Sequence, residues 1–304
     1  MLRVHILGTS SAVPAWGRHP TSQVVEHNER YLLIDCGEAT QFQLQRYKIR
    51  LRRMDAIFIS HLHGDHIFGL PGLLSSMSMG SRSSSLTIIG PEGLANFIDH
   101  NLRASDSHLS FQLDVQELPR KHVGEVFQKR GLSVRSFPLH HRVTTFGYRF
   151  EELEKRRKFL VDKALALDIP PTYFRFLKQE REVELPDGRS ILPGQVLGER
   201  PPSFSYAYCS DTVYHPPIIE HIKKVHGLYH EATFLHELKQ RAKSTKHTTA
   251  KEAAEIARQA EVGELILGHY SARYQNLEPL LKEARAVFPN TQLGKEGRTF
   301  TYGN

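Results

Sequence analysis

Cysteine and long apolar runs are scarce in this sequence. Only two cysteines, Cys36 and Cys209, occur among 304 residues, which is too few for a disulfide framework. Both lie in apolar, strand-like segments, so we expect buried free thiols, as in a protein of the reducing cytoplasm. No run of about 18 apolar residues is present, which excludes a membrane-spanning helix. Residues 1–7 alternate like a strand, so we expect no signal peptide.

The composition is otherwise that of a globular protein. Hydrophobic residues make up 39% and charged residues 24% of the chain, which excludes extensive disorder. This length suits one large domain or two small ones. Forty Lys and Arg outnumber 33 Asp and Glu, for a net charge of +7, which favours a polyanionic partner. The count of 18 histidines prompts a search for metal ligands.

Short strand-like segments alternate with helical patterns along the chain, which predicts a layered α/β protein rather than a helix bundle. The predicted strands are 2–7, 31–35, 56–60, 86–89, 112–118, 132–137, 146–150, 204–209, 228–230, 264–267 and 298–302. The predicted helices are 38–45, 93–102, 218–225, 250–260 and 278–287. Thr249 and Glu252 form a capping box at the start of one helix, and Asn276 is the expected cap of the last.

Residues 151–200 differ from the sequence on either side. The segment is rich in Pro and Gly turns, and its ten Lys and Arg balance its ten Asp and Glu. The basic residues cluster at the start, in a run from Lys155 through Arg156 and Arg157 to Lys158. We interpret the segment as an arm inserted into a domain formed by residues 1–150 and 201–304, not as a second full domain.

The strongest functional signal is the run from His61 to His66, which reads His-Leu-His-Gly-Asp-His. It directly follows the predicted strand 56–60, whose end can aim several side chains at one point. Imidazole and carboxylate groups are good ligands for zinc and similar divalent ions. Four ligand-type residues in six positions suit two adjacent ions, one bound by His61 and His63 and the other by Asp65 and His66. A polar loop with chance histidines is the less favoured alternative.

This run resembles the His-x-His-x-Asp-His signature of the metallo-β-lactamase superfamily. The resemblance implies a four-layer αββα sandwich with a dinuclear metal centre at its edge. It also implies later ligands at strand ends, where Asp211 matches the bridging aspartate and His269 the last ligand histidine. His140 and His141 compete for the remaining ligand position, because neighbours in a strand face opposite sides. Alignment back from the segment 146–149 favours His141.

Further blocks make nearly the whole chain similar to the ribonuclease Z family of tRNA 3′-processing endonucleases. These blocks are residues 7–10, 35–41, 69–74, 230–234, 247–250 and 269–274. The segment 151–200 resembles the family's flexible arm, or exosite, which clamps the tRNA elbow; its basic run 155–158 is therefore expected on tRNA. The family's early loop, Pro-x-Lys-x-Arg-Asn, corresponds to residues 14–19, with Trp16 and His19 in place of Lys and Asn. The resemblance associates this loop with recognition near the cleavage site, so the retained Arg18 is expected to bind substrate.

The resemblance implies an enzyme with two Zn²⁺ per subunit, or other divalent ions, that cleaves the 3′ trailer from precursor tRNA. It implies a 3′-hydroxyl left on the tRNA, metal-activated water as nucleophile, and a homodimer whose arm presents substrate to the partner's site. Two metal ions can stabilise both the attacking and the leaving oxygen. Asp65 is expected to bind metal and to handle the water proton.

Four further residues receive roles beside the metals. His247, held by Glu231, is expected to protonate the leaving 3′ oxygen. Arg273 and Ser271, beside the last ligand, are natural phosphate contacts.

Several interpretations stay open at this point. Trp16 either stacks on an unpaired base or packs within its loop. The basic tract from Arg46 to Arg53 either contacts the RNA backbone or is a solvated face. His230 is expected to be a buried structural histidine. The rival functions are hydrolysis of a small phosphodiester, sulfate ester or thioester, and RNA binding by a chain that has lost its metals.

Overall fold

The structure is a computed structural model, and it describes residues 1–303. The chain forms two compact units. The larger one, the core unit, contains Met1–Glu151 and the chain from Phe204 onward. The smaller one, the insert unit, contains Glu152–Ser203 and overlaps the segment that we interpret as an arm. Among residues 1–303, no helix is both long and apolar enough to cross a bilayer.

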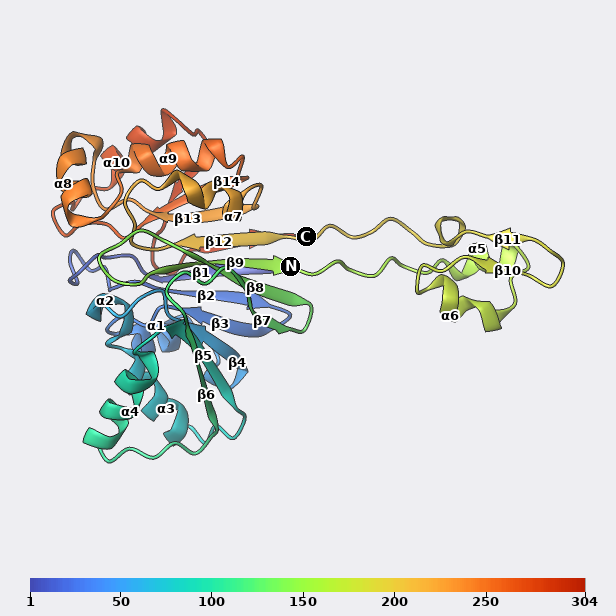
Figure 1. The fold of residues 1–304 in the computed structure, drawn as a ribbon, viewed down its shortest axis with the longest axis horizontal. Coiled ribbons are helices and arrows are strands. Elements are labelled where there is room, and N and C mark those ends of the chain that lie inside the picture. The colour runs from blue at the N-terminus through green and yellow to red at the C-terminus, as the bar shows by residue number, and fades with distance from the viewer. Residues whose placement is uncertain (304) are drawn as a thin grey trace. The chain divides into compact units, whose positions relative to one another are not determined.

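The first sheet of the core unit has seven strands in the order β16-β1-β2-β3-β4-β5-β6 (Figure 1). Strands β1 to β3 and β16 pair antiparallel, whereas β3 to β6 pair parallel. Their bounds are Leu2–Gly8 (β1), Ser22–His27 (β2), Arg30–Ile34 (β3), Met54–Phe58 (β4), Leu86–Pro91 (β5), Leu113–Leu118 (β6) and Thr299–Tyr302 (β16).

The second sheet also has seven strands, in the order β15-β14-β13-β12-β9-β8-β7. Strands β12 to β15 pair parallel, and β9 pairs antiparallel with β12. Their bounds are Gly124–Lys129 (β7), Leu132–Pro138 (β8), Phe146–Glu152 (β9), Ser205–Cys209 (β12), Gly227–Glu231 (β13), Glu264–Gly268 (β14) and Thr291–Leu293 (β15).

Helices cover the outer face of each sheet. Beside the first sheet lie α1 (Thr40–Arg46), α2 (Gly64–Ile67), α3 (Leu70–Met79) and α4 (Leu94–Ala104); beside the second lie α7 (Ile219–Ile222), α8 (Lys239–Thr245), α9 (Ala250–Gln259) and α10 (Glu278–Arg285) (Figure 1). Separate apolar clusters fill the two helix–sheet boundaries and the space between the sheets. The core unit is therefore a four-layer αββα sandwich, and the predicted fold class is confirmed.

The layer between the sheets is rich in tyrosine. Tyr148, Tyr206, Tyr208 and Tyr229 are all fully buried there. A buried phenol needs a hydrogen-bond partner, and Tyr208 finds one in the Asp35 carboxylate at 2.6 Å. The same carboxylate also accepts a hydrogen bond from His66, so Asp35 connects the layer between the sheets to the run His61–His66. Both cysteines are free and buried, as predicted.

Local signals in the sequence explain which helices were predicted and which were missed. Thr249 accepts from the backbone N–H of Glu252 and caps α9, which begins at Ala250 as predicted. Helix α3 was missed because Pro71 and Gly72 suggest a loop, although proline is well tolerated in the first helical turn.

Two predicted helices differ in detail from the structure. The expected helix 218–225 was wrong in extent, because a 3₁₀ turn at Pro216–Ile218 leads into an α7 that ends at Ile222. The last helix is capped at Leu277, although the Asn276 side chain still accepts from the first helical N–H, that of Glu278.

The insert unit has its own small core. It contains α5 (Val161–Ala166), α6 (Phe174–Leu177) and a hairpin of β10 (Val183–Glu184) with β11 (Ser190–Ile191). An apolar cluster that includes Ile169, Leu177 and Ile191 joins these elements. Of the basic run, Lys155 and Arg157 donate to backbone carbonyls within the unit, whereas Arg156 and Lys158 are exposed.

Candidate metal centre

The predicted ligand residues come from strand ends that share one edge of the sandwich. His61 and His63 follow β4, and Asp65 and His66 lie in α2 directly after them. Asp211 follows β12, His269 follows β14 and His141 lies between β8 and β9. The carboxyl ends of parallel strands open at one edge of a sheet, which is where such sites form. Apolar strands that are buried on both faces thus deliver polar side chains to one place.

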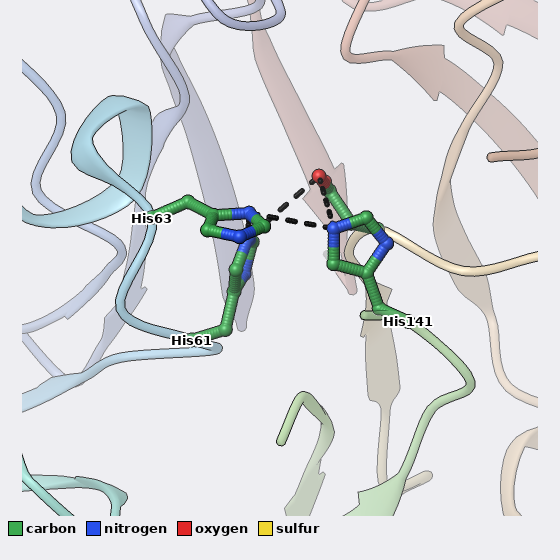
Figure 2. Close-up of side chains that lie close together, drawn as sticks. His61, His63 and His141 are labelled. Atoms are coloured by element: carbon green, nitrogen blue, oxygen red, sulfur yellow. Dashed lines mark hydrogen bonds and ion pairs between the residues drawn. The ribbon is translucent and has the colours of Figure 1, made fainter. Parts of the chain in front are cut away.

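One group of side chains contains His61, His63, His141 and Asp211. His61 Nε2 lies 3.0 Å from His63 Nδ1, and His141 Nε2 lies 3.4 Å from the same atom. Asp211 Oδ2 is 3.7 Å from the Nε2 atoms of both His61 and His141. Figure 2 shows the imidazoles of His61 and His63, from the loop after β4, meeting that of His141 from the β8–β9 connection. Such spacing places four donors around a common point.

A second group contains Asp65, His66 and His269. Asp65 Oδ2 is 3.5 Å from the Nε2 atoms of both histidines. Asp211 Oδ1 lies 3.4 Å from His66 Nε2 and 3.1 Å from His269 Nε2. Asp211 therefore offers one oxygen to each group, which is the arrangement of a bridging carboxylate between two ions.

The hydrogen bonds behind the imidazoles fit metal binding. His66 Nδ1 donates to Asp35, His141 Nδ1 to the Lys246 carbonyl and His269 Nδ1 to Thr233 Oγ1. Each ring is thereby fixed in the tautomer whose Nε2 is free to coordinate.

The orphaned ring atoms support the same conclusion. The Nε2 atoms of His66 and His269 are buried and have no hydrogen-bond partner among the described residues. Burial also lowers the pKa of His61 well below its usual value, which favours the neutral, ligating form. Buried unpartnered nitrogens cost stability, and divalent ions would satisfy them.

Asp35 fixes the orientation of the His66 ring, a role that the sequence analysis did not predict. Its carboxylate is fully buried and accepts from His66 Nδ1 at 2.7 Å, from both the backbone N–H and the hydroxyl of Ser60, and from Tyr208. The residue has a φ of 54°, a left-handed conformation uncommon outside glycine. An aspartate at a strand end was visible in the sequence, but nothing there indicated what it bonds.

The half-buried His247 and the fully buried Glu231 form an ion pair at the edge of the site. His247 Nδ1 donates to Glu231 Oε1 at 2.9 Å, and Glu231 also accepts from the Thr212 N–H and the Thr233 hydroxyl. Burial lowers the pKa of His247, but the Glu231 carboxylate outweighs it and raises the pKa to about 9. Although His247 could join a third donor group with Asp211 and His269, its Nδ1 is 3.9 Å from Asp211 and engaged by Glu231.

The structure separates the two neighbouring histidines. The His141 imidazole belongs to the donor group described above, whereas the His140 ring packs against His215 at a centroid distance of 5.6 Å. The geometry thus favours His141 over His140 as the ligand. His230 is fully buried, with its Nδ1 donating to the Glu231 carbonyl, and it lies outside every donor group among the described residues.

The early loop supplies one contact that sequence reasoning missed. The backbone N–H of Ala12 donates to Asp65 Oδ2 at 2.7 Å, and a backbone donor carries no residue signature. Trp16 donates its indole N–H to the Ala272 carbonyl while 57% of the residue stays exposed. Arg18 donates to the Tyr274 carbonyl at 2.8 Å. The early loop is therefore bonded to the segment that follows His269.

The predicted phosphate contacts lie on that same segment. Arg273 is exposed, donates to Ser271 Oγ at 3.2 Å and lies over the Phe234 ring. A cavity of 250 Å³ opens at the donor groups and is lined by Ser11, Ala12, His63, Asp65, His141, Arg142, Asp211, Thr245, His247 and His269. We call it the active-site cavity, because members of both donor groups line it.

Comparison with known proteins identifies the family. The chain is 41% identical over 293 residues to a ribonuclease Z of Porphyromonas gingivalis, a match that covers 96% of each protein. It is 40% identical over 301 residues to a ribonuclease Z of Bacteroides thetaiotaomicron, covering 99% of this chain and 95% of the relative. The chain belongs to the ribonuclease Z family.

Solved structures agree on the fold. Human tRNase Z, short form, matches with a TM-score of 0.71 and 24% identity over 98% of each chain. The metallo-β-lactamase fold protein YhfI of Bacillus subtilis matches with a TM-score of 0.69 and 19% identity, again over 98% of each chain. The αββα sandwich of this ribonuclease Z family member is therefore the metallo-β-lactamase fold.

A family model described as Anti-Pycsar protein Apyc1 matches residues 2–163. That range contains the motif His61–His66 and His141 but ends before Asp211, His247 and His269. The ribonuclease Z relatives, in contrast, extend over nearly the whole chain. The ribonuclease Z relatives therefore also cover the part of the chain that supplies Asp211, His247 and His269.

Proposed function

We propose that this protein is a metal-dependent endoribonuclease that removes the 3′ trailer from precursor tRNA and leaves a 3′-hydroxyl on the tRNA. The observation that carries the proposal is the pair of donor groups joined by Asp211, with the His247–Glu231 pair beside them. Membership of the ribonuclease Z family supports precursor tRNA as the substrate. We also propose that the protein works in the cytoplasm, consistent with its two free cysteines.

The proposed ligands are the two groups already described. His61, His63 and His141 would hold one ion, Asp65, His66 and His269 the other, and Asp211 both. The predominance of histidine favours two Zn²⁺ per subunit. Two bound divalent ions would supply Lewis-acid stabilisation of the phosphoryl oxygens and a lowered pKa for water at the site.

The chain's own groups then have distinct tasks. Asp65 is fixed by the Ala12 N–H, and its carboxylate would orient the attacking water and accept its proton. His247 has its Nδ1 occupied by Glu231, which leaves Nε2 to give a proton to the leaving 3′ oxygen. The Glu231 carboxylate raises the pKa of His247, which favours the protonated imidazole that a general acid needs. Arg273 and Ser271 would hold a phosphate beside them.

A homodimer that binds precursor tRNA, with the arm of one subunit acting on substrate in the other, completes the proposal. Two large aromatic side chains, Phe42 and Phe68, are each 67% exposed on the core unit. Exposed aromatic residues of this kind are common at protein–protein interfaces. A solution mass of one chain, measured by light scattering, would exclude the dimer.

The test of the function uses precursor tRNA with and without an encoded CCA, purified protein and mapped 3′ ends. One internal cut that releases an intact trailer and leaves a 3′-hydroxyl supports the proposal, and the CCA comparison defines which precursors are accepted. Intact precursor together with rapid hydrolysis of a small phosphodiester, sulfate ester or thioester would instead favour the rival hydrolase. RNA binding without any hydrolysis would favour the binding module.

We expect the arm to supply affinity rather than chemistry. Replacement of the arm, residues 151–200, by a short Gly/Ser linker should leave the donor groups intact, because all of them lie in the core unit. Hydrolysis of a small activated phosphodiester should continue near its original rate, whereas cleavage of precursor tRNA should fall steeply through weaker binding. The log–log salt slope of binding should fall by roughly one unit for each RNA phosphate that the arm neutralises.

A neutralised arm provides the matched control. Replacement of the exposed Arg156 and Lys158 by Gln keeps the apolar cluster of the insert unit and should give part of the same binding defect. An armless protein that processes precursor tRNA as well as the parent would refute the exosite role. Loss of the small-substrate activity in the armless protein would place the segment in the catalytic core.

A further inference from the structure

A second cavity lies beside the active-site cavity and has no part in the chemistry described so far. It measures 340 Å³, and its walls include His140, Tyr214, Lys239, Lys243, Lys246 and Glu252. We call it the lysine pocket. His247 lines both cavities, so the lysine pocket adjoins the active-site cavity at this residue.

The local fold concentrates positive charge in the lysine pocket. Lys239 and Lys243 are four residues apart in α8, a spacing that puts both on one face of the helix. Lys246 caps the helix with a φ of 64°. Like charges at this spacing destabilise a helix, so this arrangement costs some stability unless an anion lies nearby.

The one acid in the wall of the pocket pairs with only one of these charges. Lys239 is 3.3 Å from Glu252 Oε1, and Glu252 is itself occupied as the capping partner of Thr249. Among the described residues, neither Lys243 nor Lys246 forms an ion pair with a carboxylate. The lysine pocket therefore retains two ammonium groups whose charge is uncompensated, together with the exposed His140 ring.

The lysine pocket is directly linked to the metal site. The Lys246 carbonyl accepts from His141 Nδ1 at 2.8 Å, and the next residue in the chain is His247. A group bound by the Lys246 side chain would thus lie close to the imidazoles of both His141 and His247. Such coupling suits a substrate group adjacent to the scissile bond.

We propose that the lysine pocket binds an RNA backbone phosphate: the one on the 5′ side of the last tRNA nucleotide. This inference rests on the proposed function. The proton from His247 goes to the 3′ oxygen of that nucleotide, so the nucleotide itself lies against His247. The nucleotide's own 5′ phosphate then falls one residue upstream, across His247 from the metal ligands. Lys243 and Lys246 contact that phosphate, which adds affinity and aligns the 3′ oxygen with its proton donor.

The test compares Lys243→Gln with Arg241→Gln. Both residues lie in α8 and each substitution removes one charge, but Arg241 lines neither cavity. With precursor tRNA, Lys243→Gln should raise Kd and KM about tenfold, the loss expected for one charge-assisted contact. The salt slope should fall by about 0.7, the value for a single-stranded phosphate. Arg241→Gln should change Kd less than about twofold, and Lys246→Gln should behave like Lys243→Gln.

Substrates with one uncharged methylphosphonate linkage locate the contact. When the neutral linkage replaces the phosphate 5′ of the last tRNA nucleotide, wild type and Lys243→Gln should bind equally. When it lies one linkage into the trailer, the penalty of Lys243→Gln should persist. A penalty that disappears only with the trailer linkage, or equal Kd values for Lys243→Gln and Arg241→Gln, would overturn the proposal. Failure of wild type to cut unmodified precursor would overturn the proposed function, and the Kd comparison would still decide the role of the pocket.

Discussion

Asp65→Ala should reduce cleavage of precursor tRNA by on the order of 10⁴-fold, the upper range for removal of an acid–base group, and removal of a metal ligand adds to that. Asp65 Oδ2 lies within reach of both His66 and His269 and is oriented by the Ala12 N–H. In the proposed mechanism, one substitution therefore removes a ligand and the proton acceptor together. Binding of precursor tRNA should survive, because affinity comes from phosphate contacts spread over the protein.

Single-turnover cleavage, measured beside a Kd for the same precursor, tests this prediction. Asp65→Asn is the matched control, since the amide keeps the shape and can still accept from the Ala12 N–H. Asp65→Asn should be almost as inactive as Asp65→Ala if catalysis requires the negative charge of the Asp65 carboxylate. Nearly normal cleavage by Asp65→Ala, with correctly folded protein, would remove Asp65 from catalysis.

His247→Ala should slow cleavage by about a hundred-fold or more, the usual contribution of a general acid, while the metals stay bound. The imidazole is held by Glu231 at 2.9 Å, and that bond leaves Nε2 as its only free nitrogen. Loss of the side chain removes the proton donor but none of the ligands in the two proposed groups. The defect should therefore appear in kcat more than in KM.

Metal analysis of the same sample separates this role from its alternatives. Glu231→Gln is an informative companion, because it weakens the orientation of His247 without removing it and should give a smaller defect. A variant that lost metal on substitution of His247 would show that the residue serves as a ligand, using the third donor group with Asp211 and His269.

The layered α/β arrangement of the core unit was predictable because short strand-like segments alternate with helical patterns along the sequence. The run His61–His66 follows an apolar strand and was recognisable by itself, whereas Asp211 and His269 were assigned through the resemblance to the metallo-β-lactamase superfamily; in the structure they follow β12 and β14. The structure brings together all seven predicted ligands. Alternation along a strand left His140 and His141 as rivals; alignment to the family favoured His141, and the structure places the His141 ring, not the His140 ring, in a donor group.

The features that were not predicted depend on tertiary contacts. Asp35, directly after β3, accepts a hydrogen bond from His66 in α2, and the contribution of Ala12 is a backbone N–H. Neither contact has a sequence pattern, since the partners are 31 and 53 residues apart. The lysine pocket combines side chains from α8 with His140 and Tyr214. Spacing along one helix suggests Lys239 and Lys243, but not the cavity that they share with His247.

The central claim is that cleavage depends on divalent ions held by the two donor groups that share Asp211. Its most direct test is elemental analysis of protein purified without chelator, combined with a cleavage assay on the same sample before and after metal removal. We expect about two divalent ions per chain, zinc foremost, together with loss of precursor tRNA cleavage on chelation and recovery as the ions are returned. Protein that contains no metal and cleaves precursor tRNA at the full rate would contradict it.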